Sequence, residues 1–89
     1  MTEDPLVADL RSFGLDDIEA QTYVRLDRLG KAKASSLSSG LKTNRTTTYG
    51  ILERLKLIGI VESSMTRPVS FIAVEQGKAL QLLIDRRKD

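Results

Sequence analysis

The side chains best suited to chemistry in this sequence are concentrated in one stretch, TNRTTTYGILERLKLIG, which runs from Thr43 to Gly59. Its first half supplies hydroxyl groups, an amide and a guanidinium, which are groups that hydrogen-bond phosphates and base edges in protein–DNA complexes. Its second half repeats apolar residues at helical spacing. Threonine is a mediocre helix former because its branched Cβ loses rotamer freedom against the preceding turn. A helix that begins in a threonine run therefore needs a functional explanation.

A helical wheel of residues 44–58 separates an apolar face from a polar one. The apolar face holds Thr48, Ile51, Leu52, Leu55 and Ile58, and the opposite face holds Thr46, Tyr49, Gly50 and Glu53, flanked by Arg45 and Thr47. Glycine inside a helix costs about 1 kcal/mol relative to alanine, and on the polar face Gly50 would permit close approach of the backbone to DNA. We predict that this face reads a DNA groove. Ordinary solvent-facing threonines are the alternative.

The predicted DNA site contains two kinds of residue. The predicted base readers lie on the recognition helix, residues 44–58, and are Asn44, Arg45, Thr46, Thr47, Tyr49 and Gly50. The predicted phosphate contacts are Lys42 just before this helix, Arg54 within it and Arg67 at the tip of the predicted wing. Simpler interpretations exist: Asn44 can cap the helix, Tyr49 can seal the edge of the core, and a single basic side chain is often only a solvated charge. Glu53 on the outward face opposes DNA binding, unless the helix has left the groove at that point.

The charge distribution favours a polyanionic partner, and the composition argues against an enzyme. Residues 31–67 carry seven basic and two acidic side chains, a net charge of +5, in a chain of 89 residues with a formal charge of +2. Such a basic region favours nucleic acid, with a solvated lysine-rich surface as the alternative.

The sequence has no cysteine and no histidine, which removes disulfides and Cys/His zinc sites. Since no phosphate-binding glycine loop occurs either, we expect no metal, no cofactor and no enzymatic activity.

The elements that must position this surface can be read from caps and periodicity. Predicted helices cover about 5–13, 16–29, 34–41, 44–58 and 75–88, and predicted strands cover 60–65 and 69–74. Asp16 and Glu19 match a capping box, Leu29 ends the apolar stripe of the second helix, and Thr43 can cap the recognition helix. The fold class is mainly α with a small β-hairpin. One domain, 1–89, then contains a helix-turn-helix at 34–58 and a wing at 60–74.

Apolar residues near the two ends of the chain predict a homodimer. They are more numerous than a three-helix core needs: Leu6, Val7, Leu10, Leu80, Leu83 and Ile84. Symmetric regulators place two recognition helices one DNA turn apart, roughly 34 Å. Packing of both segments on their own domain is the alternative. No apolar stretch is long enough for a membrane span or a signal peptide, so we expect a cytoplasmic protein without membrane contact.

The ordered motifs resemble the winged helix-turn-helix domain of TrmB-type transcription regulators. The matching pieces are Gly14-Leu15, Glu19-Ala20 with Tyr23, Ala34-Ser35-Ser36-Leu37, Arg45-Thr46-Thr47-Thr48-Tyr49 with Leu52 and Leu55, Gly59-Ile60-Val61, and Arg67-Pro68. The resemblance implies a winged helix that binds double-stranded DNA to regulate transcription. A protein-interaction module of a transcription complex is the alternative, because the fold alone does not decide between these roles.

The sequence also departs from the family pattern. Lys42-Thr43-Asn44 stand where the family usually has Gly-Ile-Pro, so Lys42 is expected in a left-handed conformation. Thr47 stands where a lysine is usual, which removes one phosphate contact. The large C-terminal sugar-binding domain common in the family has no counterpart in these residues, so a sugar ligand is not expected. The chain is either a stand-alone DNA-binding module or part of a longer regulator.

Overall fold

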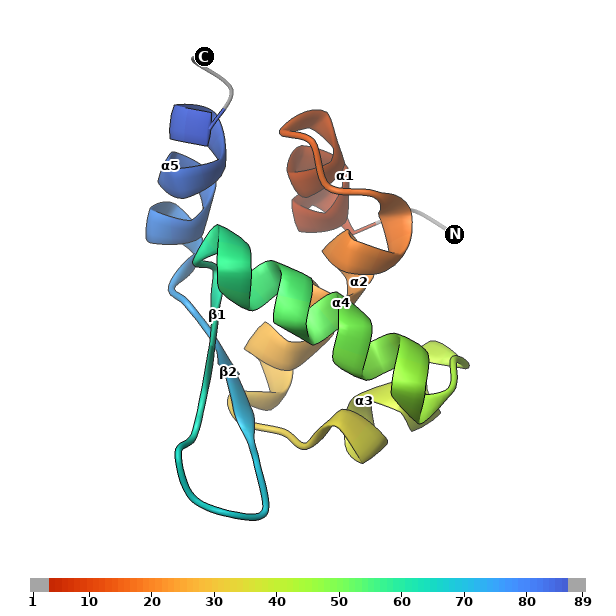
Figure 1. Cartoon of the computed structure of the whole chain (residues 1–89). Coiled ribbons are helices and arrows are strands. Elements are labelled where there is room, and N and C mark those ends of the chain that lie inside the picture. The colour runs from red at the N-terminus through yellow and green to blue at the C-terminus, as the bar shows by residue number, and fades with distance from the viewer. Residues whose placement is uncertain (1–3, 87–89) are drawn as a thin grey trace.

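Helices and a two-stranded hairpin follow one another in the predicted order in the computed structural model, which describes residues 4–86 (Figure 1). The helices are α1 (Pro5–Ser12), α2 (Asp17–Leu29), α3 (Ala34–Leu41), α4 (Arg45–Ile58) and α5 (Gln76–Arg86), and the strands are β1 (Val61–Ser63) and β2 (Phe71–Ala73). The fold class predicted from the sequence, mainly α with a small hairpin in a winged-helix order, is confirmed.

Local hydrogen bonds set the starts of α2 and α4. Asp16 Oδ1 accepts from the backbone N–H of Glu19 at 2.8 Å, and Glu19 Oε1 accepts from the N–H of Asp16 at 3.0 Å, which confirms the capping box. At α4, Asn44 Oδ1 accepts from the N–H of Thr47 at 2.7 Å. The prediction that Thr43 caps α4 is therefore wrong: Asn44 holds the extended N-cap position, and Thr43 lies one residue outside it.

The turn between α3 and α4 depends on a left-handed residue. Lys42 has φ 57° and ψ 41°, as predicted, and is the one non-glycine residue with a positive φ in the described part of the chain. Its backbone N–H returns to the carbonyl of Ser38. The buried hydroxyl of Ser38 also lies 2.8 Å from Thr48 Oγ1 on α4, so a hydrogen bond ties the two helices together across the turn.

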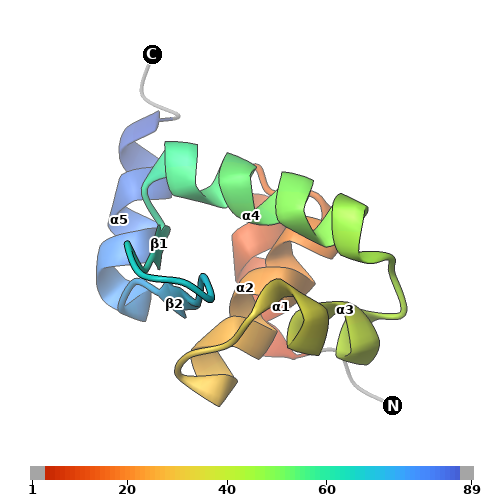
Figure 2. The same ribbon diagram turned by 60° about the horizontal axis from the view of Figure 1, so that its bottom comes forward.

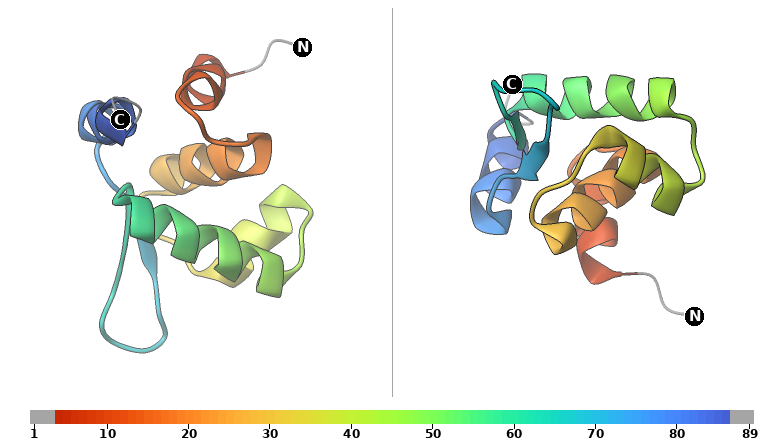
Figure 3. Two further views of the ribbon diagram at one scale, coloured as in Figure 1. Left: turned by 45° about the horizontal axis from the view of Figure 1, so that its top comes forward. Right: turned by 90° about the horizontal axis from the view of Figure 1, so that it is seen from below.

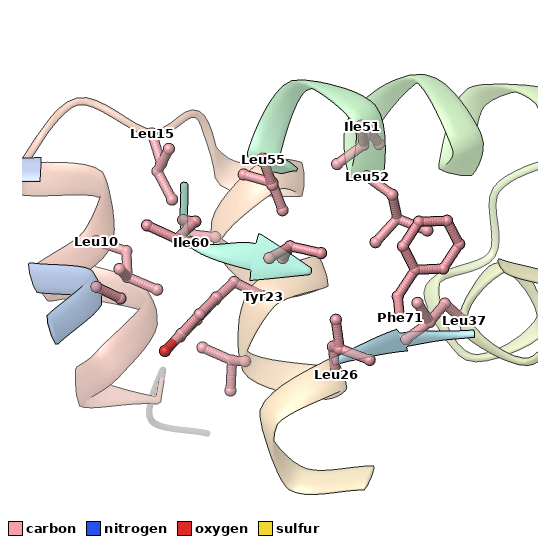
Figure 4. Close-up of a cluster of buried hydrophobic side chains, with 14 of the residues drawn as sticks. Leu10, Leu15, Tyr23, Leu26, Leu37, Ile51, Leu52, Leu55, Ile60 and Phe71 are labelled. Carbon is pink, nitrogen blue, oxygen red and sulfur yellow. The ribbon is translucent and has the colours of Figure 1, made fainter. Parts of the chain in front are cut away.

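The hydrophobic core lies between α2, α4 and the hairpin (Figure 4). Its fully buried side chains include Tyr23 and Leu26 from α2, Leu37 from α3, Leu52 and Leu55 from α4, and Ile60 and Phe71 around the hairpin. The wheel of α4 is confirmed, because Thr48 is buried with this apolar face. The predicted apolar stripe of α2 is wrong at its end, because Leu29, the last residue of the helix, is 49% exposed. Tyr23 of the same helix is fully buried.

The wing is a short hairpin with a closed loop. Its strands are shorter than predicted, and they pair antiparallel with Ser63 opposite Phe71. Within the loop, the Ser64 N–H donates to the Ser70 carbonyl at 2.8 Å, and the Ser70 N–H donates to Ser64 Oγ at 3.0 Å. On its other edge β2 bonds to Ala32, with N···O distances of 2.7 and 3.0 Å between Ala32 and Phe71. The wing is thereby attached to the segment before α3.

Helices α1 and α5 lie at the end of the molecule away from the wing loop (Figures 1 and 3). Val7, Leu10 and Leu83 are buried in the core of the single chain, with exposures of 6%, 0% and 1%. Their apolar surface is already covered by their own domain, which favours the alternative interpretation that these three residues pack within the chain. The other three predicted residues, Leu6, Leu80 and Ile84, are only partly buried.

Candidate nucleic-acid interface

Helix α4 forms one side of the molecule along its whole length (Figures 2 and 3). It contacts α3, α2 and β1 through its apolar face. The wing loop projects beyond the helices on the side of β1 and β2 (Figure 1). The outward face of α4 and the wing loop are thus both accessible to one large partner.

The first turn of α4 presents the predicted polar side chains to solvent. Arg45, Thr46 and Thr47 are exposed, whereas Thr48 is fully buried, as the wheel predicted. Asn44 is exposed too, but its Oδ1 accepts the capping hydrogen bond from Thr47. This hydrogen bond fixes the side chain of Asn44 against the start of α4, which favours the capping interpretation of this residue.

Tyr49 belongs partly to the packing between α4 and the wing. Its ring lies edge-on to Phe71 at a centroid distance of 6.0 Å and an interplanar angle of 73°. The side chain is 40% exposed. Tyr49 therefore seals the edge of the core, and its exposed part borders the outward face of α4.

Gly50 has no structural reason to be a glycine. It lies inside α4, and a Cβ built on it would have no heavy atom within 4 Å. Since a helix-interior glycine destabilises by roughly 0.5–1 kcal/mol relative to alanine, this position carries a cost that no contact within the described residues explains. The middle of the outward face of α4 therefore has a position without a side chain and with open space around it.

The predicted phosphate contacts differ in their environments. Lys42 and Arg67 are exposed, and neither forms an ion pair among residues 4–86; the same holds for Arg45. Arg54 is different, because its Nε lies 2.6 Å from Oε2 of the buried Glu19. The Glu19 carboxylate on α2 thus balances much of the positive charge of Arg54, which weakens the interpretation of this residue as a phosphate contact.

Two further basic residues lie close to the wing and were not predicted from the sequence to belong to the site. Lys31 and Lys33 flank Ala32, which pairs with β2, and both are exposed. The only sequence signal was their place in the basic region, residues 31–67. A single bridging residue is too short to show strand alternation, so the sequence could not place this segment beside the wing. At the wing tip, Met65 is 99% exposed, and no sequence signal pointed to it.

The buried phenol of Tyr23 contributes to the fold. The hydroxyl of Tyr23 donates to the backbone carbonyl of Val74, which joins α2 to the segment before α5. Burial, with smaller contributions from Asp27 and Glu75, raises the pKa of Tyr23 to about 12.

Within residues 4–86, no cluster of three or more acidic side chains is arranged to hold a metal ion. None of the described helices combines the length and hydrophobicity of a membrane span.

Comparisons with known proteins identify the family. A sequence profile described as "Sugar-specific transcriptional regulator TrmB" matches residues 10–76. The fold is similar to TrmBL2, reported as an archaeal chromatin protein with a novel mode of DNA binding, with a TM-score of 0.84 and 24% identity over 98% of this chain and 34% of that chain. The chain thus spans about a third of the length of TrmBL2. No curated protein matches the sequence.

Two further structures extend the likeness. Transcriptional regulator Tm0710 from Thermotoga maritima has a TM-score of 0.70 and 21% identity over 89% of this chain and 58% of that chain. An ArsR-like transcriptional regulator from Rhodococcus sp. RHA1 has a TM-score of 0.66 and 25% identity over 90% of this chain and 74% of that chain. The profile match over most of its length shows that the chain belongs to the TrmB family of transcriptional regulators, and the winged fold agrees with this assignment.

Proposed function

We propose that this protein binds double-stranded DNA in a sequence-specific way to regulate transcription. Helix α4 enters the major groove with its outward face, and the wing lies on the phosphate backbone or in the minor groove. Family membership supports a DNA-binding regulator, and the surface of α4 supports the groove-reading role. A cytoplasmic location follows from this function.

The observation that carries the proposal is Gly50. The described structure gives this residue no contact that requires a glycine. A helix that lies deep in the major groove, however, brings its backbone close to base edges, and a missing side chain at the nearest point permits that approach. The cost in helix stability is then retained because the site serves binding rather than folding.

The groups around Gly50 fit the two tasks of a DNA interface. Thr46 and Thr47 are exposed hydroxyls in the first turn, the part of a recognition helix that usually contacts bases. Arg45, Lys42 and Arg67 are cations without an internal ion-pair partner among the described residues. Phosphate contacts from Lys42 and Arg67 would fix the orientation, while contacts from the threonine hydroxyls and the Arg45 guanidinium to bases would discriminate between sequences.

Alanine at Gly50 separates binding from folding. Gly50→Ala should raise the free energy of unfolding by about 0.5–1 kcal/mol and at the same time weaken DNA binding, because the added methyl group occupies the contact. Gln81→Ala on the exposed surface of α5 is the control, since it changes a helix surface away from the outward face of α4. Urea unfolding measures the change in stability. Fluorescence anisotropy measures the change in affinity for a duplex that the wild type selects from a random-sequence pool. Unchanged affinity in Gly50→Ala would contradict the groove-reading role of α4.

A homodimer is the second part of the proposal. Leu6, Leu80 and Ile84 remain partly exposed at the end formed by α1 and α5. The apolar surface that these three residues leave exposed favours self-association. A symmetric dimer would place two α4 helices on successive turns of one DNA face.

A protein-interaction role is the competing function, and one residue favours it. Leu57 on the outward side of α4 is 89% exposed, and exposed apolar side chains are enriched where proteins meet. The polar composition of the neighbouring turns argues for DNA instead. A purified protein that binds no duplex from a random-sequence pool at low salt would support the protein-interaction role.

A further inference from the structure

Glu53 is an acidic residue in the middle of a surface proposed to face a polyanion. It follows Gly50 by three residues and Thr46 by seven, so the three positions share one face of α4. The Glu53 side chain is 57% exposed. At a rise of about 1.5 Å per residue, Glu53 lies only about 5 Å along the helix from Gly50. If the helix backbone approaches DNA at Gly50, Glu53 also lies within the groove; the inference thus depends on the proposed function.

The carboxylate of Glu53 is not committed to the fold. It contacts Lys56, whose Nζ lies 3.7 Å from Glu53 Oε2 in an exposed pair one turn along the helix. Such surface pairs contribute little to stability. The neighbouring guanidinium of Arg54 is directed to Glu19 instead, at 2.6 Å. Glu53 therefore keeps free acceptor positions on its outward side.

The chemistry of the major groove limits what such a carboxylate can contact. A carboxylate only accepts hydrogen bonds, so phosphates and the acceptor edge of guanine repel it. Cytosine offers its N4 amino donor and adenine its N6 amino donor, but the adenine donor lies beside the N7 acceptor. Cytosine is therefore the base whose groove edge best compensates the lost hydration of the carboxylate.

We propose that Glu53 accepts a hydrogen bond from the N4 amino group of a cytosine, and so determines the preferred base at one position of each half-site. Lys56 holds the carboxylate from the side and reduces its repulsion by the phosphates. Glu53 then disfavours random duplexes, where no amino donor faces it, while it tolerates the selected site. An acidic residue on the outward face thereby increases specificity more than affinity.

Selection from a random duplex pool tests the proposal with wild type, Glu53→Gln and the control Glu62→Gln. Glu62 is an exposed acid on β1, outside the recognition helix. Wild type and Glu62→Gln should select cytosine at the same position. Glu53→Gln should shift that position toward adenine, because an amide pairs with adenine N6 and N7. Identical base preferences in all three proteins would overturn the role of Glu53.

A modified base then tests the contact itself. N4-methylcytosine at the selected position keeps base pairing but replaces the donor that faces the groove. Wild type should lose about 5-fold or more in affinity on this duplex, a typical effect for one specific base contact, whereas Glu53→Ala should bind both duplexes equally. An equal loss in wild type and Glu53→Ala would show that the methyl group acts by crowding alone, which would overturn the contact. If the wild type selected no sequence at all, the proposed function would fail first, and Glu53 would have no reading role.

Discussion

The Nε atom of Arg54 lies 2.6 Å from Oε2 of Glu19, so helix α4 is tied to the capping carboxylate of α2. The Glu19 side chain is only 4% exposed, whereas that of Arg54 is 69% exposed. One carboxylate thus caps α2 with one oxygen and orients α4 with the other. This contact gives Arg54 a structural role that the sequence of α4 by itself does not reveal.

Arg54→Ala should lower stability more than it lowers DNA affinity. Removing the guanidinium leaves the buried Glu19 carboxylate without its cation, which should cost about 1–2 kcal/mol in the free energy of unfolding. Arg86→Ala, a change of an exposed arginine at the end of α5, is the control. Urea unfolding measures the effect, and a salt titration of DNA binding checks the other role. A fall in the salt slope of about one unit would identify Arg54 as a phosphate contact after all.

Arg45 and Arg67 should separate base reading from phosphate binding. Arg45 lies in the first turn of α4, so Arg45→Ala should cost about 1–3 kcal/mol on the selected site and little on random DNA. Competition binding on selected and scrambled duplexes measures the difference. Equal weakening on both duplexes would show that the first turn clamps the backbone and does not read sequence.

Arg67 in the wing loop should contribute affinity without preference. Arg67→Ala should weaken binding to all duplexes about equally and reduce the dependence of log affinity on log salt by roughly one unit, the change expected when one phosphate is no longer neutralised. Titrations at several salt concentrations give this slope. The control is Thr66→Ala in the same loop, which removes no charge. A steep slope that Arg67→Ala leaves unchanged would remove the wing from the interface.

The proposed dimer should depend on the partly buried residues of α1 and α5. Leu80→Glu or Ile84→Glu should shift the protein toward the monomer, because a charge in an apolar contact is costly. Light scattering at micromolar concentration measures the mass, and circular dichroism checks that the variants remain folded. A wild-type protein that shows only the 9.9 kDa species would contradict the dimer.

Tyr23 predicts a loss of stability at alkaline pH. Its pKa is raised from 10.0 to about 12 in the folded protein, so the neutral phenol is favoured by folding. The stabilisation is fully present below pH 10 and declines from there to about pH 12, because the unfolded state binds fewer protons over that range. Tyr23→Phe should cost about 1–2 kcal/mol at neutral pH because the hydrogen bond to Val74 is removed, and it should make the alkaline decline shallower. Urea unfolding at pH 9 to 12 distinguishes the two proteins; equal declines would contradict the linkage.

The sequence by itself determined the local features of this protein. The capping box of Asp16 and Glu19, the left-handed Lys42 and the two faces of α4 all depend on residues within a few positions of each other. Such features are fixed by backbone sterics and by helical periodicity, which act over one or two turns. The order of elements followed from the same local signals, and the resemblance to TrmB-type regulators connected that order to a winged helix.

Tertiary structure decided which side chains remain available for function. Arg54 meets Glu19 across 35 positions, Tyr49 meets Phe71, and Ala32 pairs with the wing. The sequence also could not show that Val7, Leu10 and Leu83 are covered by their own domain. The physical reason is that burial and ion pairing depend on which distant segments pack together. A periodic sequence shows that a face is apolar or charged, but the contacting partner appears only in the folded chain.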